Sequence, residues 1–478
     1  YDYWAGARAL SRGELTLADL ELKRGAVLQA LHGLGAGAGV ELLLALGPAV
    51  LVASLALLAL LPWGREDLRS RTAQALAGAT VLFAAGAGWL WFNAAYLNAH
   101  VLVAALLLLV ATAGVVEGRA QGPVTTAVPV SLALAGLVAA RAEAILLLGL
   151  LLAGSVAHRR LATGWRPAWF AAGGALLVWN VLLIVGHLRG GQAGPVPLVL
   201  LLGAVGGPAL AVTAWVLSRA GDRVRASVPL VVGGTLWAGT AVLTWTPVGD
   251  RVVFFDVVRR NLFEGEGEWF LTAPLIALLA TFGVVATRRV AGAGPARALI
   301  VGFVPVTLLA KLGDGAQGLA GGAEVLTVLL AGGGRPGWGD SVNRMWTHGM
   351  LVGLLLVTLA ALALTSDRPA QPRRRLMRSA PGVAALAGMV VLTFSWWDAG
   401  HLGPVGPAAV TPLVELQDPA PDRVVELVAG TRLSTTLPLP AGTTLPADVE
   451  TATVCVEVLM TDRGRANAGE FATTIAAG

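Results

Sequence analysis

The chain has 478 residues, of which 56% are hydrophobic and 13% are charged, and its formal net charge at pH 7 is +5. Soluble globular proteins carry about 25% charged residues, so this chain has too little polar surface to be solvated by water alone, and the bilayer must solvate most of it. The positive charge does not indicate nucleic-acid binding, because the basic residues are scattered over short loops and form no stripe.

Several apolar runs reach about 17–25 residues, the length that a helix needs to cross about 30 Å of hydrocarbon. The sequence therefore predicts an all-α polytopic membrane domain over residues 1–400, with about 12 transmembrane helices. The predicted spans lie near residues 41–62, 75–93, 98–116, 124–140, 143–157, 168–187, 196–217, 227–245, 270–287, 298–312, 346–365 and 379–396.

Basic residues gather in alternate loops between these spans. These loops hold 18 of the 34 basic residues but only five of the 29 acidic ones; they lie near residues 63–74, 117–123, 158–167, 218–226, 288–297 and 366–378. Because short Arg-rich loops stay in the cytoplasm, we assign them to that side. The sequence thus predicts a multi-pass protein of the cytoplasmic (inner) membrane, with external loops at 1–40, 246–269 and 313–345.

The composition changes after Trp397. Short runs with strand character, punctuated by Pro, Gly and Asp, predict a C-terminal external (periplasmic) β-sandwich-like domain at 411–478, or the first part of one. The predicted strands are Arg423–Val428, Thr431–Leu437, Thr451–Met460 and Glu470–Ile475.

Two segments on the predicted external side carry residues that suit chemistry. Asp2 precedes two aromatic residues just outside the membrane, where a carboxylate could act as a general base or could cap a helix. Arg141 and Glu143 lie at a turn between two spans, where ionisable residues are functional candidates, with a structural salt bridge or snorkelling as the alternative.

A third segment, Asp340–His348, leads into a span. Its Arg344 and His348 are one helical turn apart, and an Arg at this place could hold a phosphate through two hydrogen bonds. Lys311 offers a second positive charge at the end of the preceding span. The structural alternatives are a cap, a snorkelling Arg and a packed His. The sequence contains no Walker A motif, no HExxH motif and no Cys/His cluster with zinc spacing, which argues against an ATP-driven pump.

The order of these segments resembles the GT-C class of membrane glycosyltransferases, which transfer sugars from a polyprenyl-phosphate carrier outside the cytoplasmic membrane. Asp2–Gly13 is similar to the family's acid–aromatic–Ala–Gly first loop, and Leu22–Val27 lies where the family has an amphipathic segment. Leu137–Leu148 is similar to its Arg-Pro-Glu-Gly-Leu-Leu turn, with Ala142 in place of Pro, and Asp340–His348 resembles its late Asn-Arg segment. The near absence of Lys is typical of a GC-rich bacterial genome, such as an actinobacterial one. The family's first span would precede Tyr1, and the chain stops in a predicted strand. We therefore expect further chain at both ends.

This resemblance implies that Asp2 is the catalytic base, and that positive side chains bind the leaving lipid phosphate. The candidates for phosphate binding are Arg344 and Lys311 first, and Arg259 and Arg260 in the amphipathic segment 246–269 second. Residues expected to contact substrate are Tyr3, Trp4, Lys23, Arg24, Trp346 and His348, with Arg141, Glu143 and Asn343 supporting the site. Some relatives hold a divalent cation, Mg²⁺ or Mn²⁺, at the first-loop acids. This chain has one acid where many members have two, which leaves metal binding open.

The implied partners are the lipid bilayer, a polyprenyl-phosphate-linked sugar and a glycan or lipid-linked acceptor. A transporter or flippase of a lipid-linked glycan is the main rival, but it predicts ionisable residues at mid-membrane depth, where these spans are nearly free of charge. The third hypothesis is a non-catalytic scaffold that presents the β domain. Such a scaffold would need neither the Asp2 segment nor the Asn-Arg segment.

Overall fold

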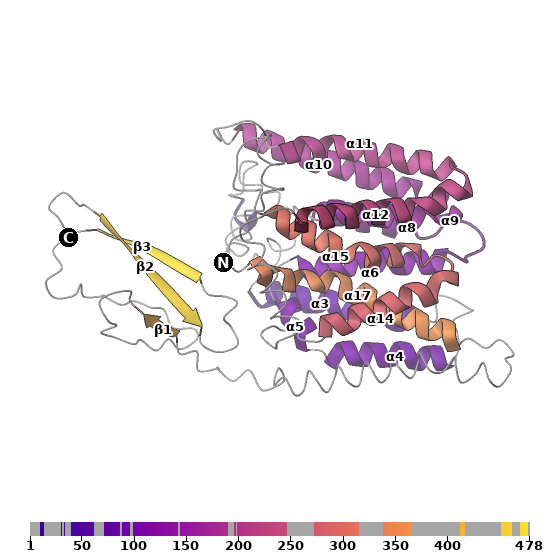
Figure 1. Cartoon of the computed structure of the whole chain (residues 1–478), viewed down its shortest axis with the longest axis horizontal. Helices are drawn as coiled ribbons and strands as arrows, with labels where there is room; N and C mark the ends of the chain where they lie inside the picture. Colours follow the sequence, from indigo (N-terminus) through magenta and orange to yellow (C-terminus); the bar gives the residue numbers. More distant parts are fainter. Residues whose placement is uncertain are drawn as a thin grey trace.

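The computed structural model describes residues 10–13, 30, 33, 40–61, 71–86, 88–95, 99–141, 144–189, 196, 198–245, 272–314, 338–365, 412–415, 451–460 and 469–476. These residues form a helical bundle and a separate β-sheet (Figure 1). The helices are α3 (Val40–Leu60), α4 (Arg71–Gly86), α5 (Gly88–Ala95), α6 (His100–Glu117), α7 (Ala127–Val138), α8 (Ala144–Val156), α9 (Arg159–Gly164), α10 (Arg166–Arg189), α11 (Leu198–Arg219), α12 (Asp222–Trp245), α14 (Thr272–Ala286), the 3₁₀ helix η4 (Thr287–Arg289), α15 (Gly294–Asp314) and α17 (Trp338–Thr365).

Helices coincide with the predicted apolar runs, except that the run at 379–396 lies outside the described residues. The run at 75–93 forms two helices, because α4 ends at Gly86 and α5 begins at Gly88, and glycine has a low helix propensity.

Four helical segments are both long and apolar enough to cross a membrane: His100–Glu117, Arg166–Arg189, Leu200–Arg219 and Trp346–Ala363. The described residues therefore support a helical membrane protein, but with fewer clear spans than the sequence predicted. One reason is length, because α7 has 12 residues and α8 has 13. Another is charge, because α12 begins with Asp222, Arg223 and Arg225.

The outer surface of the bundle is apolar. On α11 the large hydrophobic side chains Leu202, Val205 and Val212 are exposed, and on α12 Leu230 is 78% exposed. Water would penalise such contiguous apolar faces, whereas lipid tails solvate them. This surface agrees with the membrane assignment drawn from composition.

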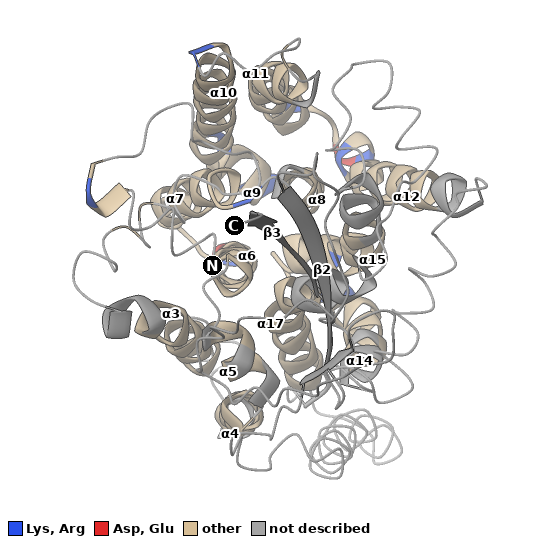
Figure 2. Cartoon of the chain, turned by 90° about the vertical axis from the view of Figure 1, so that its left-hand side faces the viewer, with Lys and Arg blue, Asp and Glu red and all other residues tan. Residues whose placement is uncertain are grey.

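The centre of the bundle is formed by α17 and α6. The window Trp346–Ala363 of α17 is 94% buried, and α17 packs against α4, α6, α14 and α15 (Figure 2). Glycines allow helix ends to meet closely: a Cβ on Gly118 would collide with the backbone of Gly292, and one on Gly154 with that of Gly294. These contacts bring the turns after α6, α8 and η4 to one end of the bundle.

We call this the basic end, because it carries most of the described arginines. They are Arg71, Arg119, Arg159, Arg160, Arg166, Arg219, Arg223, Arg225, Arg288, Arg289 and Arg297. The start of α6, the end of α7 and the start of α17 lie at the opposite end, because the long helices that follow one another along the chain run in opposite directions. Figure 1 shows the bundle from the side.

The C-terminal region contains a three-stranded antiparallel sheet in the order β1–β2–β3. Its strands are β1 (Pro412–Glu415), β2 (Thr451–Met460) and β3 (Gly469–Ala476). In register, Leu413 pairs with Leu459, and Cys455 pairs with Ala472. The predicted strand Thr451–Met460 has the bounds of β2, and Glu470–Ile475 lies within β3. The described strands form one sheet rather than a two-sheet sandwich, and the predicted strands Arg423–Val428 and Thr431–Leu437 lie outside the described residues.

Candidate functional site

A buried polar cluster lies at the end of the bundle opposite the basic end. Nη1 of Arg141 lies 3.3 Å from Nε2 of His100, and Nδ1 of His100 lies 2.8 Å from Nε2 of His348. Arg141 and His100 are each 4% exposed, and His348 is 1% exposed. We call these three residues the His–Arg cluster.

Three helices position the cluster. His100 is the first residue of α6, Arg141 follows the turn that ends α7, and His348 lies within α17. The two imidazole rings are tilted by 34°, with centroids 4.9 Å apart. The cluster therefore joins segments that are separated by up to 248 residues in the sequence.

The hydrogen bonds of the cluster have a direction. A guanidinium only donates, so Nε2 of His100 must accept from Arg141. The proton of a neutral His100 then sits on Nδ1 and is donated to Nε2 of His348. The chain thus places a permanent positive charge next to His100, which in turn contacts His348, at the end of the bundle opposite the basic end. A guanidinium in this place can donate hydrogen bonds to an anion.

Further polar atoms are buried on the same turn of α17. Nε1 of Trp346 and Oγ1 of Thr347 have no hydrogen-bond partner within the described structure. The Trp346 ring packs on Phe303 of α15, with centroids 5.7 Å apart, and is 8% exposed. Buried donors without acceptors are costly, so this turn is suited to meet a group that accepts hydrogen bonds.

The structure brings together two residues predicted from the sequence, Arg141 and His348. Lys311 lies on α15, near its end, and Asn343 and Arg344 lie on α17, all toward the end of the bundle that holds the His–Arg cluster. Only their backbone is described. The other predicted site residues fall outside the described residues: Asp2, Tyr3, Trp4, Lys23, Arg24, Glu143, Arg259 and Arg260.

Sequence reasoning missed His100. A single His at the start of an apolar run has no distinguishing pattern, and its role becomes visible only through its contacts with Arg141 and His348. The sequence holds one weak signal. His100 is a polar residue at the start of an apolar run, on the same predicted side of the membrane as the turn that contains Arg141.

No group of three or more His, Cys, Asp and Glu is placed to hold a metal ion among the residues that the structure describes. Asp2, where the resemblance places the cation of some relatives, lies outside them.

The chain matches no protein-family model, no curated protein and no solved structure.

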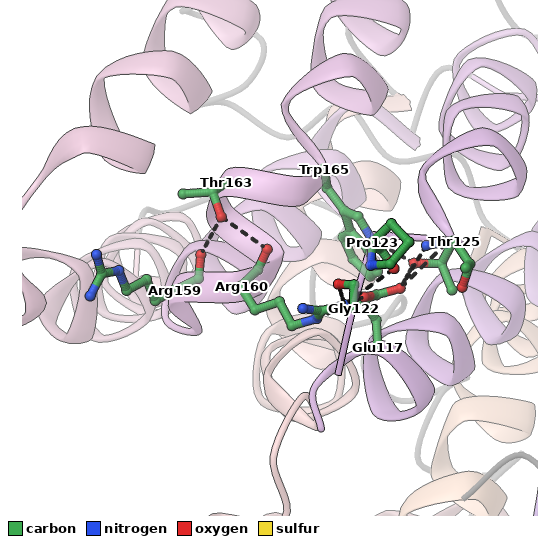
Figure 3. Close-up of polar contacts among 9 residues, drawn as sticks. Glu117, Gly122, Pro123, Thr125, Arg159, Arg160, Thr163 and Trp165 are labelled. Atoms are coloured by element: carbon green, nitrogen blue, oxygen red, sulfur yellow. Dashed lines mark hydrogen bonds and ion pairs between the residues drawn. The ribbon is translucent and has the colours of Figure 1, made fainter. Parts of the chain in front are cut away.

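A second buried cluster lies at the basic end, around the fully buried Glu117 (Figure 3). Its carboxylate pairs with Arg160, with Nε at 2.7 Å, and accepts the hydroxyl of Thr126 at 3.0 Å and the backbone N–H of Thr125 at 3.2 Å. Nε1 of Trp165 donates to the Thr126 hydroxyl at 2.9 Å. Every oxygen of this carboxylate is engaged, so the Glu117 cluster is a structural connection between the turns after α6 and α8.

Replacing Glu117 by Gln is expected to destabilise the protein by about 2–4 kcal/mol, because Arg160 loses its ion partner in a largely buried place. Thermal unfolding in detergent measures the change. Thr163→Val is the matched control on α9, the helix that carries Arg160, since Thr163 is exposed and its hydroxyl donates to the carbonyls of Arg159 and Arg160. A shift of equal size in both variants would contradict the structural role of Glu117.

His158, between α8 and α9, gives the stability a pH dependence. Its pKa is lowered, first because burial disfavours the charged imidazole and second because Arg160 repels it. The unfolded chain takes up a proton as the pH falls through about 6.5, whereas the folded chain takes it up only at a lower pH. The contribution of His158 to the free energy of unfolding is therefore full above about pH 6.5 and decreases as the pH falls below that value. We expect Tm of His158→Gln to fall less than that of the wild type as the pH is lowered from about 7.5 to 5.5, and equal slopes would refute this.

Proposed function

We propose that this protein transfers a sugar from a polyprenyl-phosphate carrier to a cell-envelope glycan or another acceptor on the external face of the cytoplasmic membrane. The observation that carries the proposal is the His–Arg cluster. It joins Arg141 and His348, from two segments that resemble GT-C motifs, and it lies at the end of the bundle opposite the arginine-rich turns. A buried cation at this boundary suits a reaction whose leaving group is a lipid phosphate.

We further propose that the membrane domain contains more helices than the four clear spans. Helices α3 and α15 have 21 residues each, and α12 has 24. At about 1.5 Å per residue such helices reach about 30 Å, the thickness of the hydrocarbon core. We propose that they cross the membrane as well. With the shorter apolar helices α4, α5, α7, α8 and α14 and the predicted run at 379–396, they would make a GT-C-like arrangement of about 12 spans with the basic end in the cytoplasm. The C-terminal sheet then belongs to an external β-sandwich-like domain.

In the proposed reaction, the Asp2 carboxylate takes the proton of an acceptor hydroxyl. The acceptor oxygen forms a bond to the anomeric carbon, while the bond from that carbon to the phosphate oxygen breaks and the electron pair leaves with the lipid phosphate. The positive charge of Arg141 and of the nearby helix-borne Arg344 and Lys311 stabilises the developing negative charge. Tyr3 and Trp4 supply aromatic faces for the sugar.

A transporter of lipid-linked glycans is the second candidate. Among the described residues, the buried charged side chains Glu117, Arg141 and Arg225 lie at helix ends rather than at mid-span. The buried polar groups within spans are neutral, such as Asn180 and the hydroxyl pair Thr80–Thr358. This distribution favours chemistry at the rim over passage of a charged group through the bundle.

The test is sugar release by the purified full-length protein from a panel of polyprenyl-phosphate sugars, with candidate acceptors present. The proposal predicts acceptor-dependent release from at least one donor. If folded protein releases no sugar from the panel but moves the labelled lipid between leaflets of a vesicle, the transporter takes precedence.

A further inference from the structure

The corner between α11 and α12 presents charge and apolar surface together. α11 ends at Arg219 and α12 begins at Asp222, so a two-residue turn joins the two helices at the basic end (Figure 1). α11 packs mainly on α10, whereas α12 packs mainly on α15 and α8, so the two helices share little contact beyond the turn. Each therefore leaves an apolar face uncovered next to this corner.

The turn is fixed by Arg225. This side chain is 6% exposed, donates to the carbonyl oxygen of Ala220 at 2.6 Å and forms an ion pair with Asp222. The carboxylate of Asp222 is thus engaged by Arg225, while Arg219 and Arg223 are exposed. With three arginines and one carboxylate, the corner carries a net charge of 3 − 1 = +2.

An aromatic residue connects the charge to the apolar face. The guanidinium of Arg219 lies over the ring of Trp215, with its central carbon 3.9 Å from the ring centroid. Below this pair, the exposed hydrophobic side chains of the two helices continue along the bundle: Val212 and Val216 on α11, and Leu230 and Val231 on α12. Arg and Trp at the boundary of an apolar surface are the residues that meet lipid headgroups.

We propose that this corner binds an anionic phospholipid, such as phosphatidylglycerol, independently of sugar transfer. The phosphodiester lies against the guanidinium groups of Arg219 and Arg223, and the acyl chains lie along the exposed faces of α11 and α12. A lipid is favoured over a free phosphate because the positive charge borders an apolar surface on both helices. A zwitterionic lipid matches the apolar faces but not the charge of +2.

The experiment uses the full-length protein, delipidated in detergent and titrated with phosphatidylglycerol or with phosphatidylcholine of the same acyl chains. Native mass spectrometry measures the bound lipid. The wild type is expected to prefer phosphatidylglycerol, and Arg219→Gln with Arg223→Gln is expected to weaken its binding about 10- to 30-fold. The matched control is Arg288→Gln with Arg289→Gln, which removes two exposed arginines from another turn of the same end and is expected to keep the preference.

Three results would overturn the proposal. One is the absence of a preference for phosphatidylglycerol in the wild type. Another is an equal loss in both double variants, which would show diffuse attraction to the whole basic end. The third is displacement of the lipid by glycerol phosphate at equal concentration, which would show a site for a free phosphate. Should the first double variant misfold, the wild type still tests the idea, because its binding must weaken as salt is raised from about 50 to 500 mM.

Discussion

Under the proposed sugar transfer, replacing Asp2 by Asn is expected to lower the rate by about 10²- to 10⁴-fold, with little change in KM for the donor. The amide keeps the size of the side chain but cannot accept the proton of the acceptor hydroxyl, and general-base catalysis contributes an effect of that order. Single-turnover transfer from a polyprenyl-phosphate sugar, followed by release of labelled sugar, measures the change. Asp2→Glu serves as the conservative variant, and it is expected to regain part of the activity.

An Asp2→Asn protein with wild-type turnover would show that another carboxylate is the base, while the glycosyltransferase class would still stand. Asp19 and Glu21 in the same predicted external segment 1–40 would then be the next residues to replace.

Replacing Arg141 by Gln is expected to lower kcat/KM for the donor by about 10- to 100-fold, because the substitution removes the buried positive charge beside His100 and His348. Part of the loss should persist at saturating donor, since in the proposed reaction the positive charge stabilises the departing phosphate. Arg141→Lys keeps the charge but not the planar donor geometry, so its kcat/KM is expected to lie between those of the wild type and of Arg141→Gln.

The control for this second prediction is Arg189→Gln. Arg189 is exposed at the end of α10, on the same end of the bundle as the His–Arg cluster, so it tests loss of charge without loss of the cluster. Thermal unfolding of all variants separates a folding defect from a catalytic one. A folded Arg141→Gln protein with wild-type kinetics would remove the cluster from the proposed site.

The helices could be predicted because a membrane helix is recorded locally, as an uninterrupted apolar run of sufficient length. The strand Thr451–Met460 was predictable for a similar reason, since its β-branched and apolar residues are contiguous. β1 was missed because it has four residues and starts at Pro412. As the order β1–β2–β3 places β1 at an edge of the sheet, a proline there removes no central hydrogen bond.

The candidate site was only partly predictable. Arg141 and His348 were noticed because ionisable residues are rare beside apolar runs. Their connection through His100 depends on how α6, α7 and α17 pack, which no local pattern records. The same is true at the basic end. The Arg-rich loops predict that Glu117 and Arg160 lie on the same side of the membrane, but not that they form an ion pair across 43 residues.

The position of the carrier phosphate tests the proposed function most directly. A cryo-electron microscopy map of the full-length protein in a lipid nanodisc, saturated with polyprenyl phosphate, would locate it. If the protein acts as proposed, the phosphate lies at the end of the bundle that holds His100, Arg141 and His348, with its polyprenyl tail along the outer helices. A carrier phosphate bound at the basic end, beside the turns of Arg160 or Arg219, would contradict it.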